Sequence, residues 1–338
     1  MGNPRLAVAS LGGTITMTSG DTSHGVAPSL TAADLLSTVP SLAQIADVRA
    51  QTLVKKPGAS LEFADVLDAL GWAHDAVADG AVGVVLVQGT DTLEETSYLL
   101  DLHWDRPEPL VVTGAMRSPQ QAGADGPANL LAAALTATAP ASRGLGVLVV
   151  MNDEVHAAAR VRKRDSTATD AFGSVPFGPL ARVHEGRVTY ANRPDPWPAL
   201  PLPARGRSPR VALLETCLGD GGDLLRLVID AGYDGVVIDG FGVGHLSAEM
   251  ADIVSKAVAA GPVVLASRTG AGTVLSRTYG FTGSEQDLIA RGVIPAGWLD
   301  GRKSRIVLWS LLATGAPLER IREVFGARGG DPGGPGHN

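Results

Sequence analysis

The fold of this chain is decided by one stretch, VVLVQGTDTLEET (Val84–Thr96). Its first four residues form an unbroken apolar run, which is typical of a parallel strand that is buried on both faces. The small polar turn Gly89-Thr90-Asp91 follows, and Thr92–Trp104 then has the spacing of an amphipathic helix. A strand that passes through such a turn into a helix predicts an α/β domain with a parallel sheet.

The rest of the first half repeats this alternation. Further apolar runs occupy Leu6–Ala9, Leu110–Val112 and Leu145–Val150, and helical patterns occupy Leu61–Ala78 and Pro127–Ala137. Two runs also end in small polar turns, Gly12-Gly13-Thr14 and Gly114-Ala115-Met116. Because ligands of open parallel sheets bind beyond the carboxyl ends of the strands, we expect the site at these turns.

The second half predicts a separate, smaller α/β domain. A hairpin is expected at Val183–Tyr190 around Glu185-Gly186, and the five prolines within Arg193–Ser208 predict a linker. The expected strands and helices that follow are Val211–Leu214, Asp223–Ala231, Val236–Ile238, Ser247–Ala259, Val263–Ala266, Ser304–Leu312 and Leu318–Phe325. We therefore predict domains over 1–192 and 209–325, a linker over 193–208 and a disordered Gly/Pro-rich tail over 326–338.

Composition excludes several classes of protein. The 338 residues are 45% hydrophobic, so the chain can bury a core, and a net charge of −7 disfavours a nucleic-acid binder. The single cysteine, Cys217, excludes an intrachain disulfide framework and a cysteine-based zinc site. The apolar run after Arg5 is too short for a signal peptide, and Gly126–Ser142 reads as a buried helix rather than a membrane span. These features predict a cytoplasmic protein without nucleic-acid or membrane partners.

Common catalytic and cofactor motifs are absent from the sequence. It contains no phosphate-binding loop, no G-x-S-x-G elbow and no H-E-x-x-H, and its seven histidines are scattered. The glycine-rich stretch Gly240–Gly244 lacks the full dinucleotide fingerprint and is better interpreted as a tight turn after a strand. We expect neither a cofactor nor a metal ion.

Two threonine-bearing turns and one lysine remain as candidates for chemistry. Thr14 follows the glycine pair, and Thr90 stands beside Asp91, although Asp91 or Thr92 could simply cap the next helix. Lys163 lies in the basic run Arg160–Arg164, which could equally be a solvated face. A threonine hydroxyl needs a base before it can act as a nucleophile, and a lysine beside a carboxylate can be that base. Thr90, Asp91 and Lys163 could form such a group.

The strings that carry these residues resemble those of bacterial L-asparaginases. They are Gly12-Gly13-Thr14-Ile15, Gln88–Thr96, Gly114-Ala115-Met116-Arg117, Asp125–Leu130 and Met151-Asn152-Asp153, in the order and spacing of that family. The combination of G-T-D-T-x-E-E-T with G-A-M-R is specific, and the resemblance extends from about Arg5 to Phe325.

The resemblance implies a flavodoxin-like N-terminal domain, a smaller C-terminal α/β domain and an amidohydrolase without a cofactor. It implies that Thr14 and Thr90 are the two catalytic threonines, that Lys163 pairs with Thr90, and that Asp91 binds the substrate α-amino group. Ser60 would hold the α-carboxylate, and the backbone of Ala115 would contact the amide that is hydrolysed. The substrate would be L-asparagine, with L-glutamine as a second amide, and the assembly a homodimer or homotetramer.

Two features depart from the family pattern. No tyrosine follows the first threonine on the expected lid, so the group that activates Thr14 is open: His24 is the nearest titratable residue, and it reads better as an exposed loop histidine. The glutamate that some members lend to a neighbouring subunit has only a weak match in Glu285.

Two other functions compete with an asparaginase. An amidotransferase subunit that releases ammonia for a tRNA-bound substrate normally has an extra N-terminal domain, whereas Gly12-Gly13-Thr14 follows only eleven residues here. A non-catalytic amino-acid-binding protein on the same scaffold would not need Thr14, Thr90 and Lys163 together.

Overall fold

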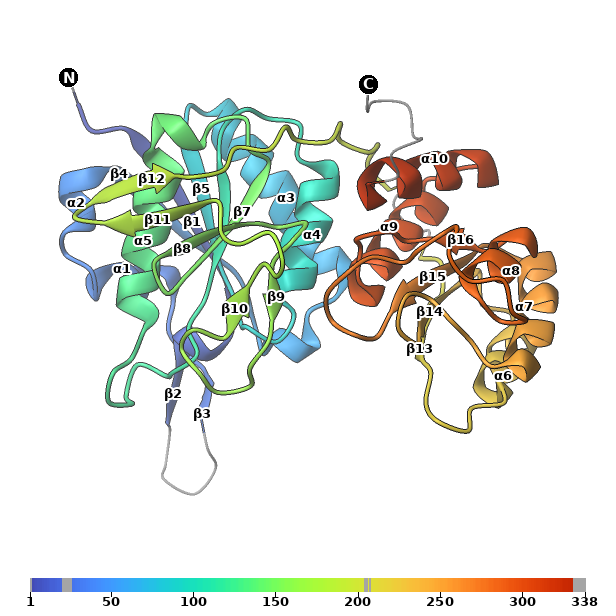
Figure 1. The fold of residues 1–338 in the computed structure, drawn as a ribbon. Helices are drawn as coiled ribbons and strands as arrows, with labels where there is room; N and C mark the ends of the chain where they lie inside the picture. Colours follow the sequence, from blue (N-terminus) through green and yellow to red (C-terminus); the bar gives the residue numbers. More distant parts are fainter. Residues whose placement is uncertain (1, 20–25, 204–205, 207, 331–338) are drawn as a thin grey trace. The chain divides into compact units, whose positions relative to one another are not determined.

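A computed structural model describes residues 2–19, 26–203, 206 and 208–330. The chain divides into two compact units, residues 1–199 and 200–338. Each unit is built on its own sheet (Figure 1).

An eight-stranded sheet forms the centre of the N-terminal unit, in the order β12-β11-β8-β7-β6-β5-β1-β4. The strands from β7 to β4 are parallel, as the apolar runs predict, and β8, β11 and β12 add antiparallel strands at one edge. Their bounds are β1 Arg5–Gly12, β4 Asp47–Lys56, β5 Gly83–Val87, β6 Leu110–Thr113, β7 Val147–Met151, β8 Glu154–Ala157, β11 Ala181–His184 and β12 Arg187–Tyr190. The predicted hairpin is confirmed: it is β11–β12, with Glu185 and Gly186 at positive φ.

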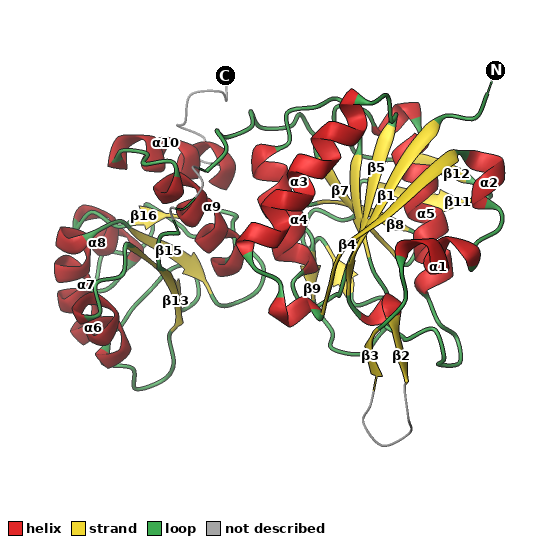
Figure 2. Ribbon diagram, turned by 180° about the vertical axis from the view of Figure 1, so that it is seen from behind, coloured by secondary structure: helices red, strands yellow, loops and turns green. Residues whose placement is uncertain are grey.

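Helices cover both faces of this sheet, which is why β5, β6 and β7 are wholly buried (Figure 2). Helices α3 (Phe63–Ala78) and α4 (Leu93–His103) lie side by side on one face. Helices α1 (Ala32–Ser37), α2 (Leu42–Ile45) and α5 (Gly126–Thr138) share a hydrophobic core with the strands. Two short ribbons lie outside the main sheet, β2–β3 (Met17–Ser19 and Val26–Pro28) and β9–β10 (Arg162–Lys163 and Phe172–Gly173).

The C-terminal unit contains a four-stranded parallel sheet in the order β13-β14-β15-β16. The strands are β13 Val211–Glu215, β14 Gly235–Gly240, β15 Val263–Ser267 and β16 Ile294–Pro295; the helices are α6 Asp223–Asp230, α7 Ala248–Ala260, α8 Glu285–Ala290, α9 Gly301–Ala313 and α10 Leu318–Gly329. Helix α10 continues to Gly329, so the first residues of the predicted tail are helical, and residues 331–338 lie outside the described part of the chain. Cys217 is exposed just after β13.

No helix in the described residues is long and apolar enough to cross a bilayer.

Candidate active site

The turns that follow β1, β4 and β5 are held together by three glycines. A Cβ on Gly13 would lie 2.0 Å from the backbone nitrogen of Gly89, and a Cβ on Gly89 would lie 2.8 Å from that of Gly58. Gly13 also has a φ of +87°, which residues with a side chain rarely adopt. Backbone therefore packs directly on backbone, and the segments that carry Thr14, Ser60 and Thr90 meet at one edge of the sheet.

Thr14 and Ser60 each lie in a short 3₁₀ turn at this edge. Thr14 begins the turn Thr14–Thr16, which is closed by hydrogen bonds from the Thr16 backbone N–H and Oγ1 to the Gly13 carbonyl. Ser60 ends the turn Gly58–Ser60, and Thr92 Oγ1 donates to the Gly58 carbonyl at 2.9 Å. This second contact fixes the Ser60 turn to the start of α4.

Thr90, Asp91 and Lys163 are brought into direct contact. Lys163 Nζ lies 2.9 Å from Thr90 Oγ1 and 3.1 Å from Asp91 Oδ1. Thr90 is buried, and the Lys163 side chain is 17% exposed, so its Nζ group is largely shielded from solvent. The Asp91 side chain is 62% exposed and keeps a face free for a positively charged group. Lys163 therefore does not belong to a solvated basic face.

Ala115 lies in a turn that several polar groups hold in place. Asp125 accepts hydrogen bonds from the backbone N–H groups of Met116 and Arg117, at 2.9 Å each. Asn129 donates to the Gly114 carbonyl at 3.0 Å and accepts from the Asn152 N–H at 2.9 Å. Asn129 thus joins the loops after β6 and β7. A Cβ on Gly126 would come within 2.9 Å of Ile15 and 3.5 Å of Ala115, so this turn also lies near the Thr14 segment.

Glu285 belongs to the C-terminal unit and is fully buried there. Its Oε1 accepts the N–H groups of Thr278 and Tyr279, and its Oε2 lies 3.2 Å from His245 Nε2. Burial alone would raise the pKa of Glu285, but these hydrogen bonds together hold it below its usual value. These three partners of the Glu285 carboxylate all belong to the C-terminal unit. His24, the other weak candidate, lies outside the described residues.

Sequence reasoning missed Thr92 and Asn129 as parts of the site. In the sequence, Thr92 is explained by helix capping, and Asn129 is one of the residues of the family string Asp125–Leu130. Their partners, Gly58 and Asn152, are 34 and 23 residues away in sequence, so only the folded chain shows the contacts.

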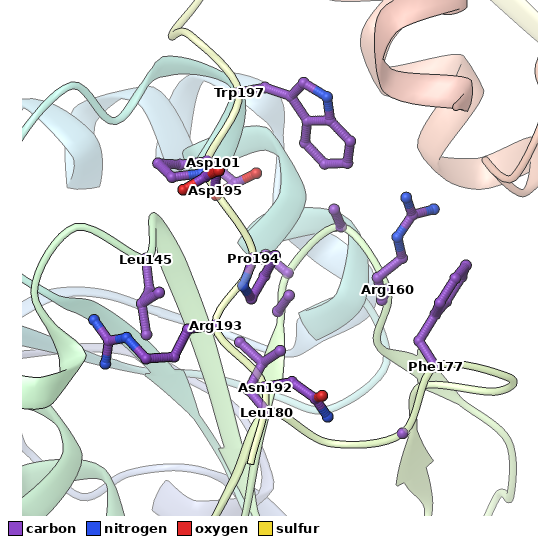
Figure 3. Close-up of a pocket in the computed structure, with 15 residues that line it drawn as sticks. Asp101, Leu145, Arg160, Phe177, Leu180, Asn192, Arg193, Pro194, Asp195 and Trp197 are labelled. Carbon is purple, nitrogen blue, oxygen red and sulfur yellow. The ribbon is translucent and has the colours of Figure 1, made fainter. Parts of the chain in front are cut away.

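A cavity of about 500 Å³ lies elsewhere in the N-terminal unit (Figure 3). It is lined by Asp101, Leu145, Ala157–Arg160, Phe177, Gly178, Leu180 and Asn192–Trp197, none of which is a predicted catalytic or binding residue. The guanidinium carbon of Arg160 lies 4.6 Å from the centroid of the Phe177 ring and 5.4 Å from that of Trp197. The Arg160 guanidinium is therefore held by two aromatic rings that line this cavity.

Within the described ranges, no group of three or more His, Cys, Asp or Glu side chains could hold a metal ion.

Comparison with known proteins gives matches over both units. The family model for the N-terminal domain of asparaginase matches residues 5–196, and that for the glutaminase/asparaginase C-terminal domain matches residues 210–325. A probable L-asparaginase of Deinococcus radiodurans is 36% identical over 331 residues, which is 95% of this chain and 97% of that protein. L-asparaginase 2 of Escherichia coli K12 is 32% identical over 95% of this chain and 92% of that protein. The crystal structure of a probable cytoplasmic L-asparaginase from Campylobacter jejuni matches with a TM-score of 0.85 and 28% identity, covering 96% of this chain and 99% of that one.

Proposed function

This chain belongs to the asparaginase family, and from that premise we propose that it is an L-asparaginase in which Thr14 is the nucleophile. The reaction converts L-asparagine and water to L-aspartate and ammonia. The observation that carries the mechanism is the contact of Lys163 Nζ with Thr90 Oγ1 at 2.9 Å, because it joins a buried hydroxyl to a shielded amine.

The first half of the reaction forms an ester with Thr14. Its oxygen attacks the side-chain amide carbon, the C–N bond breaks, and the hydroxyl proton leaves with the nitrogen as ammonia. Backbone N–H groups near Thr90 and Ala115 stabilise the oxyanion. Asp91 binds the α-ammonium group and Ser60 binds the α-carboxylate, which holds the amide at Thr14.

The second half returns the enzyme to its starting state. Thr90 and Lys163 orient a water molecule and accept its proton as its oxygen bonds to the ester carbon. The ester C–O bond then breaks, Thr14 regains a proton and L-aspartate leaves. In the first half, the same pair can pass the proton lost by Thr14 to the leaving nitrogen, which departs as ammonia. The group that first takes the Thr14 proton is either His24 or Lys163 acting through Thr90 or a bound water, and we favour the second.

We also propose a homodimer or homotetramer in the cytoplasm. The single cysteine and the likeness to the Campylobacter jejuni protein support the location. We propose L-glutamine as a second amide substrate, whose rate of hydrolysis can be compared with that of L-asparagine.

Three substitutions test the proposed mechanism. Thr14→Val keeps the shape of the side chain but removes the hydroxyl, and we expect it to abolish ammonia release. Thr90→Val and Lys163→Met should each lower kcat by at least about a hundredfold, because groups that act as a unit fail together. Ammonia release from L-asparagine and L-glutamine measures the loss, and Tm checks the fold.

The control is Arg160→Met, which removes a cation three residues before Lys163 whose guanidinium, within the described residues, stacks on Phe177 and Trp197 instead of contacting Thr90 or Asp91. We expect it to retain most of the activity. Near-normal turnover by Lys163→Met would contradict the proposed role of the lysine, and failure of the wild-type protein to release ammonia from either amide would contradict the proposed function itself.

A further inference from the structure

Strand β9, which carries Lys163, does not belong to the sheet that carries Thr90. It is two residues long and, among the strands that the structure describes, pairs only with β10, with Lys163 opposite Phe172. The neighbouring hydrogen bond to β10 comes from the Arg164 N–H, which donates to the Ala171 carbonyl at 2.7 Å. Since successive N–H groups of a strand point to opposite sides, the Lys163 N–H points away from β10.

The acceptor on that other side is Glu94. The Lys163 backbone N–H donates to Glu94 Oε2 at 2.7 Å, a short hydrogen bond between residues 69 positions apart. Glu94 is 2% exposed and lies in the first turn of α4, where the helix dipole favours a negative charge. Its side chain therefore crosses from the helix to the backbone of the strand.

The same helix end carries Thr90 and Asp91 only a few residues earlier. Helix α4 therefore positions both Thr90 and Lys163. Thr90 is positioned because its segment leads directly into the helix, and Lys163 because its backbone N–H is bound by Glu94. The other hydrogen bonds of Lys163 with this helix end, within the described residues, come from the lysine Nζ itself, to Thr90 and Asp91. Because Nζ takes part in the proposed proton transfer, its contacts cannot also be relied on to fix the position of the Lys163 backbone.

We propose that Glu94 is a positioning residue that holds the backbone of Lys163 against the start of α4, so that Nζ stays within reach of Thr90. The inference rests on the proposed role of Lys163 in catalysis. From the local sequence alone, Glu94 would be interpreted only as an acidic residue that stabilises the first turn of α4. The proposal gives this carboxylate a second function.

The test is a double-mutant cycle that combines Glu94→Ala with Lys163→Met. In the wild-type background we expect Glu94→Ala to lower kcat by at least about tenfold with little change in KM, since a misplacement of about 1 Å can cost a hundredfold. In the Lys163→Met background the same change should lower the residual rate, measured with enzyme in excess, by less than about twofold. Glu94→Gln retains an oxygen acceptor and should restore kcat to within about threefold of wild type.

Glu95→Ala is the matched control, because it removes the adjacent carboxylate from the same helical turn. Whatever it does to stability, its effect should be the same in both backgrounds. Equal losses for Glu94→Ala in both backgrounds would mean that Glu94 supports only the fold, and would overturn the proposal.

A second measurement does not depend on activity. Hydrogen exchange of the Lys163 amide should become at least about tenfold faster in Glu94→Ala and stay unchanged in Glu95→Ala. Unchanged protection in Glu94→Ala would also overturn the proposal. If the wild-type protein hydrolysed neither amide, the proposed function would fail while exchange would still report on the hydrogen bond.

Discussion

Four basic residues stand within positions 160–164 of the chain, and the surroundings of three of them give these three different roles. Arg160 stacks on two aromatic rings, Arg164 donates to the Phe172 carbonyl, and Lys163 contacts Thr90 and Asp91. A lysine suits the position beside Thr90, because its side chain ends in a compact amine that can give or take a proton. An arginine side chain stays charged. The chemistry thus depends on which residue of the run faces the end of β5.

His156 gives the protein a pH-dependent stability. It is buried on β8, its Nδ1 lies 3.0 Å from Ser174 Oγ, and its Nε2 lies 3.4 Å from Glu154 Oε2. Burial, helped by the charges of Arg164 and Arg182, lowers the pKa of His156 from 6.5 to about 4. As pH falls from 6.5 to 4, the unfolded chain takes up a proton that the native protein does not. Stability should therefore fall over this window by about 3 kcal/mol.

Urea unfolding at pH 7.5 and pH 5 measures this effect. We expect the loss of stability on acidification to be smaller in His156→Gln than in wild type by about 2 kcal/mol. His184→Gln, at an exposed histidine on the adjacent strand β11, serves as the control and should behave like wild type. An identical pH dependence in wild type and His156→Gln would contradict the prediction.

At the scale of elements, the site depends on the close approach of the turns that follow β1 and β5, where the backbones of Gly13 and Gly89 are in contact. We expect Gly13→Ala to lower kcat by at least about tenfold and to lower Tm, because its Cβ would overlap the Gly89 backbone at a positive φ. Thermal unfolding and ammonia release measure the two effects.

The matched control for this glycine is Gly71→Ala in helix α3, where a Cβ would meet nothing within 4 Å. It should raise stability by about 0.5–1 kcal/mol, because alanine is the better helix former. If Gly13→Ala kept wild-type kcat and Tm, the close approach of the two turns would not be needed.

The elements that sequence predicted well are those with a strong local pattern. The strands β5, β6 and β7 are runs of Val and Leu, and their burial on both faces leaves such a pattern. Strand β4 has no such pattern, because it lies at the edge of the sheet, has no buried residue, and carries charged and polar residues among its apolar ones.

Contacts between residues that are far apart in the chain are harder to predict from sequence. The chemistry of the side chains allowed Thr90, Asp91 and Lys163 to form a group, and the resemblance to a family implied the pairing of Lys163 with Thr90. No local pattern placed these two residues in contact. Glu94 looks like any acidic residue in a first helical turn, since its partner is a backbone amide and every residue except proline offers one. The family strings pointed to the residues of the proposed chemistry, whereas the groups that hold them in place required the structure.

At the scale of the whole molecule, both units leave large apolar side chains in contact with solvent. Val175 and Phe177 are 52% and 47% exposed, and Leu218, Leu224 and Leu227 exceed that in the C-terminal unit. A large contiguous apolar patch marks an interaction site, and these side chains are candidates for such a patch. Together with the family resemblance, they support assembly of several copies.

Light scattering at micromolar concentration tests this assembly. We expect a mass of two or four times the 34.7 kDa of one chain, unchanged by a tenfold dilution or by added salt, as an apolar interface predicts. A single species at the mass of one chain would count against a homo-oligomer.

The exposed thiol of Cys217 has a practical consequence. The N-terminal unit contains no cysteine, so a maleimide dye would label each chain once, just beyond the end of β13 in the C-terminal unit. No cysteine has to be removed first, and none has to be introduced. The natural sequence therefore already provides a defined attachment point for fluorescence experiments, such as following the exchange of subunits between differently coloured populations.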